Sequence, residues 1–226
     1  MFRHLASLTR TFAALGLLSA TIVSGHLQAQ ESPKASVPEA KPTLKIVQPR
    51  EFCQRVTNAM TSLGTQSGLE RRDAVRLGGK ASAAIIAQLK SGTMMPYLDT
   101  ETFKPSAIAV SDRKWFSLSE VLVSSLGILP GRVLMVENLN DLRLTSQVMP
   151  GSQLLVLASS LGDFTAERAK LVAQTAQALG VQINIIWVNS NRDSQNVRAA
   201  QGLAFMTSLT GGSFLDLSAE GACGQT

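Results

Sequence analysis

Three short, largely apolar segments separated by two helical patterns constrain the fold of this chain most strongly. The segments are Gln153–Ala158, residues 181–188 and residues 213–217. Their length and their apolar character are typical of strands buried on both faces of a parallel sheet. Parallel neighbours need long crossover connections, and a helix between each pair of strands supplies one. The alternation therefore predicts an α/β fold.

The two intervening segments have helical spacing and recognisable ends. In residues 165–179 apolar side chains recur every three or four positions, Asp163 or Thr165 can cap the start, and Gly180 can end the helix. Ser194 can cap a second helix, which a pair of glycines would end. We expect a doubly wound, mainly parallel sheet with helices on both faces, in three layers.

The chain before these segments offers further elements for the same domain. We expect helices over residues 51–63 and 69–89, the second broken at Gly78-Gly79, and a loop over 91–104. A capping box at Ser117 and Glu120 predicts another helix start. A short helix is expected within residues 138–149. Further short strands are expected at residues 44–47, 107–110 and 132–136.

Residues 1–29 have the pattern of a signal peptide. Arg3 and Arg10 supply the positive start. The apolar run that follows, residues 11–23, is too short to span a bilayer, and Ala29 offers a small residue at the cleavage point. An uncleaved membrane anchor is the alternative. Residues 30–50 are rich in proline and predict an extended linker. We therefore expect a periplasmic or extracellular protein with no membrane span after signal removal.

Residues 51–226 would then form a single α/β domain. Its front portion, residues 51–104, either joins the sheet or forms a separate helical layer. Without residues 1–29 the count of Lys and Arg falls from 21 to 19 against 16 acids, so the net charge drops from +5 to +3. This mild balance, with few aromatic residues, does not favour nucleic-acid binding.

The positions of the histidines exclude several classes of catalytic and metal site. The chain has two, His4 and His26, and both lie in the predicted signal peptide. The exported chain could therefore run no Ser-His-Asp or Cys-His mechanism and build no histidine-containing zinc site. No cofactor motif is complete either, so we expect a protein without metal, cofactor or catalytic residues. A hydrolase built on Asp163 and Asp216 has no supporting spacing.

The two cysteines of the chain are Cys53 and Cys223. In an oxidising compartment such a pair favours one disulfide bond, which would join the start of the domain to its end. Two free buried thiols are the alternative. The cysteines form no Cys-x-x-Cys motif, so a thioredoxin-type role has no support.

The rear half of the chain also resembles a known family. Strand Gln153–Ala158, a polar loop with Asp163, a helix, a strand opened by Gly180 and a closing Thr210-Gly211-Gly212 segment are similar to the second half of a von Willebrand factor type A domain. The family's Asp-x-Ser-x-Ser metal motif is missing at residues 48–52 and at 111–115. The resemblance implies a three-layer α/β domain of a family that mostly binds proteins, as a degenerate member without the metal site.

These observations favour an exported protein-interaction module, a non-catalytic component of an envelope or secretion assembly whose partners are other proteins of that assembly. Binding is expected at the rim where strands end and helices begin. The candidate residues there are Ser159, Ser160, Asp163, Asn189, Ser190 and Asn191. The alternative is a domain that binds a small ligand or anion at the helix starts near residues 163–165 and 193–194.

Overall fold

A computed structural model describes residues 43–109, 115–128, 131–142, 144, 150–191, 193–218 and 223. These residues belong to one compact unit, residues 40–226. The predicted signal peptide and most of the predicted linker lie outside the described residues. In the described part of the chain, no helix is both long and apolar enough to cross a bilayer.

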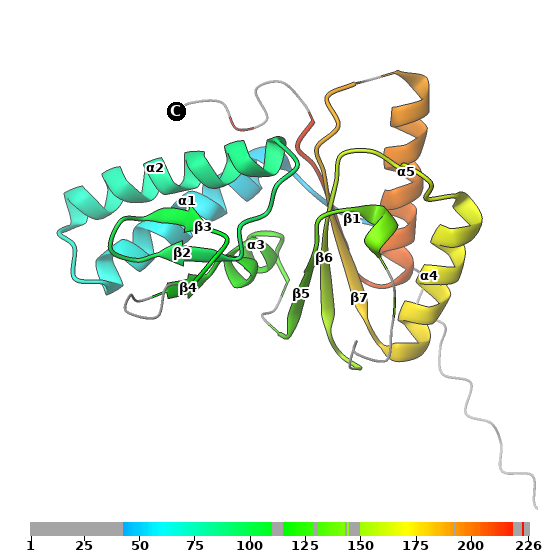
Figure 1. The fold of residues 1–226 in the computed structure, drawn as a ribbon, viewed down its shortest axis with the longest axis horizontal. Coiled ribbons are helices and arrows are strands. Elements are labelled where there is room, and N and C mark those ends of the chain that lie inside the picture. The colour runs from blue at the N-terminus through cyan, green and yellow to red at the C-terminus, as the bar shows by residue number, and fades with distance from the viewer. Residues whose placement is uncertain are drawn as a thin grey trace, which may run out of the picture. The chain divides into compact units, whose positions relative to one another are not determined.

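A five-stranded parallel sheet is the centre of the described structure (Figure 1). Its strand order is β1-β8-β7-β6-β5. The strands are β1 (Lys45–Val47), β5 (Val133–Val136), β6 (Gln153–Ala158), β7 (Gln182–Trp187) and β8 (Ser213–Asp216). All six residues of β6 are buried, as its continuous apolar run predicts. The expected α/β class is confirmed.

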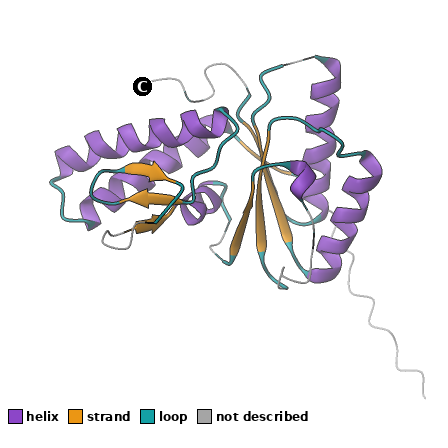
Figure 2. Cartoon of the chain, viewed as in Figure 1, coloured by secondary structure: helices purple, strands orange, loops and turns teal. Residues whose placement is uncertain are grey.

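Helices cover both faces of this sheet (Figure 2). Alternate residues of β6 point to opposite faces, so Leu154 and Val156 share a core with helices α4 (Ala166–Leu179) and α5 (Ser194–Leu209). Leu155 and Leu157 belong to the core on the other face. That core includes residues of helices α1 (Pro49–Gln66) and α3 (Leu118–Ser125). The structure therefore has the three layers expected.

The order of the strands determines where helices can lie. From β5 to β8, each strand is added beside the previous one in chain order. Right-handed crossovers between successive neighbours place their connections on one face, which explains why α4 and α5 share a core. Doubly wound sheets bind ligands where the direction of strand addition reverses, and no such point lies among these four strands.

One buried amide ties the middle strands together. Asn184 of β7 is fully buried, and its side chain donates to the carbonyl of Leu154 at 3.3 Å and accepts from the amide of Ser213 at 2.9 Å. Leu154 belongs to β6 and Ser213 to β8, so one side chain contacts the backbone of both neighbouring strands. Beside it, Gly212 lies so close to the carbonyl of Ile183 that a Cβ would come within 1.9 Å of the oxygen.

Helix α2 (Arg71–Lys90) continues through Gly78 and Gly79, so the expected break there is wrong. The close approach of α1 to α2 explains why a glycine stands inside this helix. A Cβ on Gly78 would lie 2.7 Å from the backbone nitrogen of Thr61 on α1, whereas one on Gly79 would meet nothing within 4 Å. Glycine at position 78 therefore permits the helices to pack closely, although it lowers helix propensity.

A second sheet begins within residues 91–104, which were expected to be a loop, so that expectation is wrong at residues 97–99 and 104. Strands β2 (Tyr97–Asp99), β3 (Lys104–Ser106) and β4 (Trp115–Ser117) form an antiparallel sheet in the order β3-β2-β4. The strand expected at residues 107–110 is wrong for 107–109, and residue 110 lies outside the described residues. The turn between β2 and β3 is held by Asp99, whose carboxylate accepts from the amides of Glu101 and Thr102.

Two helix starts differ from expectation in their capping residue. Asp193, rather than Ser194, caps α5 by accepting from the amide of Asn196. Helix α3 follows Ser117 as expected, but this serine makes no capping bond, and its hydroxyl lies 2.8 Å from that of Ser119. The short helix expected within residues 138–149 is a 3-10 turn at Leu139–Asp141, and residues 143 and 145–149 lie outside the described part.

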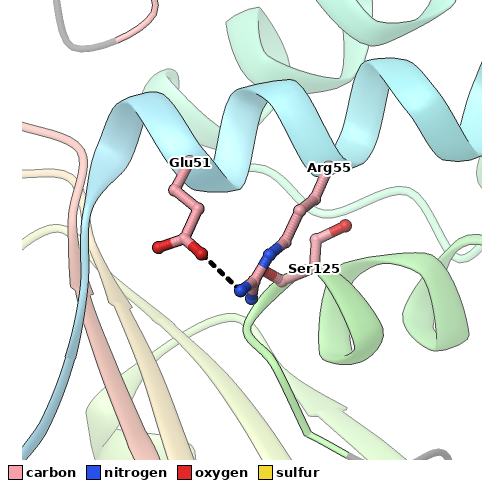
Figure 3. A network of polar contacts seen from close by, with 3 residues as sticks. All are labelled: Glu51, Arg55 and Ser125. Carbon is pink, nitrogen blue, oxygen red and sulfur yellow. Dashed lines mark hydrogen bonds and ion pairs between the residues drawn. The ribbon is translucent and has the colours of Figure 1, made fainter.

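Helix α1 is fixed at two further points. Cys53 and Cys223 form the expected disulfide bond, with their Cα atoms 5.8 Å apart. Figure 3 shows Arg55, whose guanidinium pairs with Glu51 and also donates to the carbonyl of Ser125 at 3.2 Å. Because Ser125 is the last residue of α3, the cation interacts with the free carbonyls of a helix end.

Candidate functional site

The structure brings only some of the predicted rim residues together. Ser159 and Ser160 follow β6, and Asn189 to Asn191 follow the neighbouring β7, so all lie at the carboxyl edge of the sheet. Asn189 and Asn191 line a hollow of about 280 Å³. Ser159, Ser160, Asp163 and Ser190 line neither this hollow nor the larger groove described below. The predicted rim is therefore not one continuous site.

The polar groups of the smaller hollow are engaged with one another. Asn189 accepts from the amide of Asn191 at 2.8 Å and donates to the side chain of Asn196 at 3.1 Å. The carboxylate of Asp216, which also lines the hollow, accepts from the amide and the hydroxyl of Ser218. A ligand would have to replace these internal bonds, which lowers what it could gain. The polar side chains of this hollow therefore act mainly in holding its loops together.

The helix starts that could hold an anion carry capping side chains. Thr165 accepts from the amide of Arg168 at 3.2 Å, and Asp193 accepts from that of Asn196 at 2.8 Å. These bonds satisfy amides that an anion would otherwise use. Asp193 also places a negative charge at the start of α5, where it disfavours a second anion. Neither helix start therefore has the geometry of an anion site.

The larger concave surface lies between α4 and α5. We call it the α4–α5 groove; its volume is about 900 Å³. Its floor is apolar and buried, and its rim is exposed and mostly polar. The floor consists of Phe164, Ala199, Leu203 and Met206. The main rim residues are Lys170, Gln174, Arg198, Gly202 and Phe205. An apolar centre inside a polar rim is typical of protein–protein interfaces.

One end of the α4–α5 groove is bridged and its middle is open. The side chain of Gln177 on α4 donates to the carbonyl of Leu209 on α5 at 2.6 Å, which links the last turns of the two helices. Gly202 leaves the wall of α5 open, because a Cβ there would meet nothing within 4 Å. Next to this opening, Phe205 is 61% exposed. The groove therefore presents a large aromatic side chain beside an unfilled space.

The charges of the groove have one sign. Lys170 and Arg198 are the charged residues that line it, and each is the fifth residue of its helix. Because β6, β7 and β8 are parallel, α4 and α5 run in the same direction, and both cations lie in the amino-terminal half of their helices. Neither has an ion-pair partner among the described residues. The groove thus combines apolar surface with two available positive charges.

Sequence reasoning missed this groove because α5 carries two apolar stripes. Val197 lies on the stripe that includes Ala200 and Ala204, and it is 44% exposed. The buried side of α5 includes Leu203, Ala204 and Met206. The signal was present in the sequence: apolar residues occupy both stripes, and a helix on the surface of a sheet buries only one side.

The described residues hold no group of three or more His, Cys, Asp or Glu side chains placed to bind a metal. None of the residues that line the α4–α5 groove is His, Cys, Asp or Glu. Comparisons of the chain with models of known protein families, with curated proteins and with solved structures find no match.

Proposed function

We propose that this chain is an exported protein-interaction module, a non-catalytic component of an envelope or secretion assembly, and that it binds its partner protein through the α4–α5 groove. One observation carries the proposal. An apolar floor with an exposed aromatic residue and two available cations forms a groove of about 900 Å³ on the outer side of the helix layer.

Burial by a partner protein would contribute the most free energy at Phe205. A phenylalanine side chain buries at least about 150 Å² when it is fully enclosed, so the 61% that is exposed corresponds to roughly 100 Å². At about 25 cal/mol per Å², burying this surface is worth around 2 kcal/mol before the costs of association. Aromatic residues in such positions often dominate binding energy.

Two further observations agree with export, and one resemblance agrees with a binding role. The disulfide bond between Cys53 and Cys223 is typical of proteins that fold in an oxidising compartment. The signal pattern in residues 1–29 predicts delivery to such a compartment. The resemblance to von Willebrand factor type A domains, which remains a prediction, also implies protein binding.

Site-specific photo-cross-linking tests this function. A photoreactive benzoylphenylalanine replaces Phe205 in the full chain expressed in its native host, and a matched variant carries it at Val75 of α2, which is 53% exposed. We expect a defined cross-linked polypeptide from position 205 and none from position 75. Equal cross-linking from both positions, or none from either, would contradict binding at the groove.

A further inference from the structure

We infer that the α4–α5 groove takes an amphipathic α-helix of the partner protein, with an apolar stripe along one side and acidic residues towards one end. This inference rests on the proposed function and specifies its partner. It assigns a binding mode in which the occupant lies along α4 and α5 and contacts both.

The shape of the groove favours a helix. Two helices running in the same direction form its walls, and α4 alone is 14 residues long, which corresponds to about 21 Å. An occupant of similar length is a helix of roughly four turns, and such helices dock in grooves through residues spaced i, i+3, i+4 and i+7. The unfilled space at Gly202 beside Phe205 lets a side chain of that stripe approach α5 closely.

The exposed rim of the groove argues against a small apolar ligand such as a fatty acid. Small-molecule sites bury about 70–90% of their ligand's surface. Here the side chains at the rim, including Gln174, Arg198 and Phe205, are exposed, so the groove is open to solvent. An acyl chain lying on it would keep much of its surface in water. A helix instead hides one face on the floor and keeps its polar face in solvent.

The charges determine which helix fits. Lys170 and Arg198 lie one turn from the start of their helices, and the bridged end of the groove carries the neutral Gln177. Acidic side chains at one end of the occupant would meet these cations, whereas basic ones would be repelled. Exposed ion pairs are individually weak, so we expect each cation to change affinity only about threefold and the two together about tenfold.

A displayed peptide library tests the inference with the full chain. The library has a helical scaffold of about 18 residues, or five turns, with one face randomised to apolar, acidic and basic residues. Selected peptides are then measured by fluorescence anisotropy. We expect an apolar stripe at helical spacing with Asp or Glu at one end. A proline placed in the middle of a selected peptide should abolish binding, because it breaks the helix.

Variants of the chain locate the binding. Phe205→Ala should weaken a selected peptide at least tenfold, and Lys170→Glu combined with Arg198→Glu about tenfold, with a reduced dependence on salt. The matched controls are Leu171→Ala, which is 64% exposed on α4 but outside the groove, and Lys80→Glu on α2. Both controls should leave the affinity for the peptide unchanged. That result would show that truncating an exposed apolar side chain, or reversing an exposed charge, weakens binding only within the groove.

The outcomes separate this inference from the proposed function. Selection of basic, charge-neutral or proline-rich peptides, or no selection at all, overturns the amphipathic acidic helix. Loss of binding in the Leu171 or Lys80 variant but not in the Phe205 variant also overturns it. Binding of oleate that Phe205→Ala weakens, without binding of any peptide, would overturn the inference and assign the groove to an acyl ligand. Cross-linking from position 205 would still support protein binding if the peptides failed.

Discussion

Two adjacent glycines of α2 should respond in opposite ways to the same substitution. A Cβ added at Gly78 would lie 2.7 Å from the backbone nitrogen and 2.9 Å from the Cα of Thr61 on α1. A Cβ added at Gly79 would meet nothing within 4 Å. Backbone atoms cannot move aside as the end of a flexible side chain can, so Gly78→Ala must separate the two helices.

The expected magnitudes follow from two opposing effects. Alanine is favoured over glycine inside a helix by about 1 kcal/mol, which Gly79→Ala should gain almost in full. Gly78→Ala gains the same amount but overpacks the contact between α1 and α2, at a cost of about 1–3 kcal/mol. We expect the free energy of unfolding to rise by about 0.5–1 kcal/mol for Gly79→Ala and to fall by up to about 2 kcal/mol for Gly78→Ala.

Urea denaturation of the two variants and the parent chain, with the disulfide intact, measures these differences. Unchanged slopes would show that the denatured state is comparable in all three proteins. The comparison is well controlled because both substitutions are Gly→Ala in the same turn of the same helix. If Gly78→Ala were as stable as Gly79→Ala, α1 and α2 would not approach each other at Thr61, and the packing described for them would be wrong.

Three further changes test the sheet and the link between the ends of the domain. Gly212→Ala would place a Cβ 1.9 Å from the carbonyl oxygen of Ile183, so we expect a loss of at least about 2 kcal/mol in thermal or urea unfolding; a neutral effect would exclude this register. Asn184→Leu removes a side chain that bonds both neighbouring strands and should cost about 2–3 kcal/mol, measured in the same way, whereas a stabilised variant would contradict those bonds. The bond between Cys53 and Cys223 spans 170 residues, so the double Cys→Ser variant should lose about 2–4 kcal/mol of unfolding free energy. Mass spectrometry of the unreduced parent chain should show a mass lower than that of the reduced chain by two hydrogen atoms; two free thiols in the parent would refute the bond.

The parallel sheet could be predicted because its signals are local. Residues 153–158 form a continuous apolar run between turn residues, and the observed strand β6 has the same bounds. Gly180 ends α4 in the left-handed conformation that favours glycine, with a φ of 63°, as its position after an apolar stripe predicts. Cys53 and Cys223 could be paired because the chain offers no other cysteine.

The remaining features depend on contacts between distant residues. Gly78 looks like a helix breaker in the sequence, and only the position of Thr61 explains it. Strands β2 and β3 have three residues each and carry little hydrophobic pattern, and their sheet also depends on the pairing of β2 with β4, which lies further along the chain. The α4–α5 groove depends on the spacing of two helices, which no local pattern determines. The exposed Phe205 could be noticed in the sequence, but its surroundings could not.

The most direct test of the account is the identity of the polypeptide segment that becomes attached to a photoreactive residue at position 205. Mass spectrometry of the digested cross-linked product gives the sequence of that segment. The account predicts a partner segment with apolar residues at helical spacing and acidic residues at one end, because the groove pairs an apolar floor with Lys170 and Arg198. A basic or proline-rich segment would contradict the proposed partner class, and attachment only to lipid would contradict a protein partner altogether.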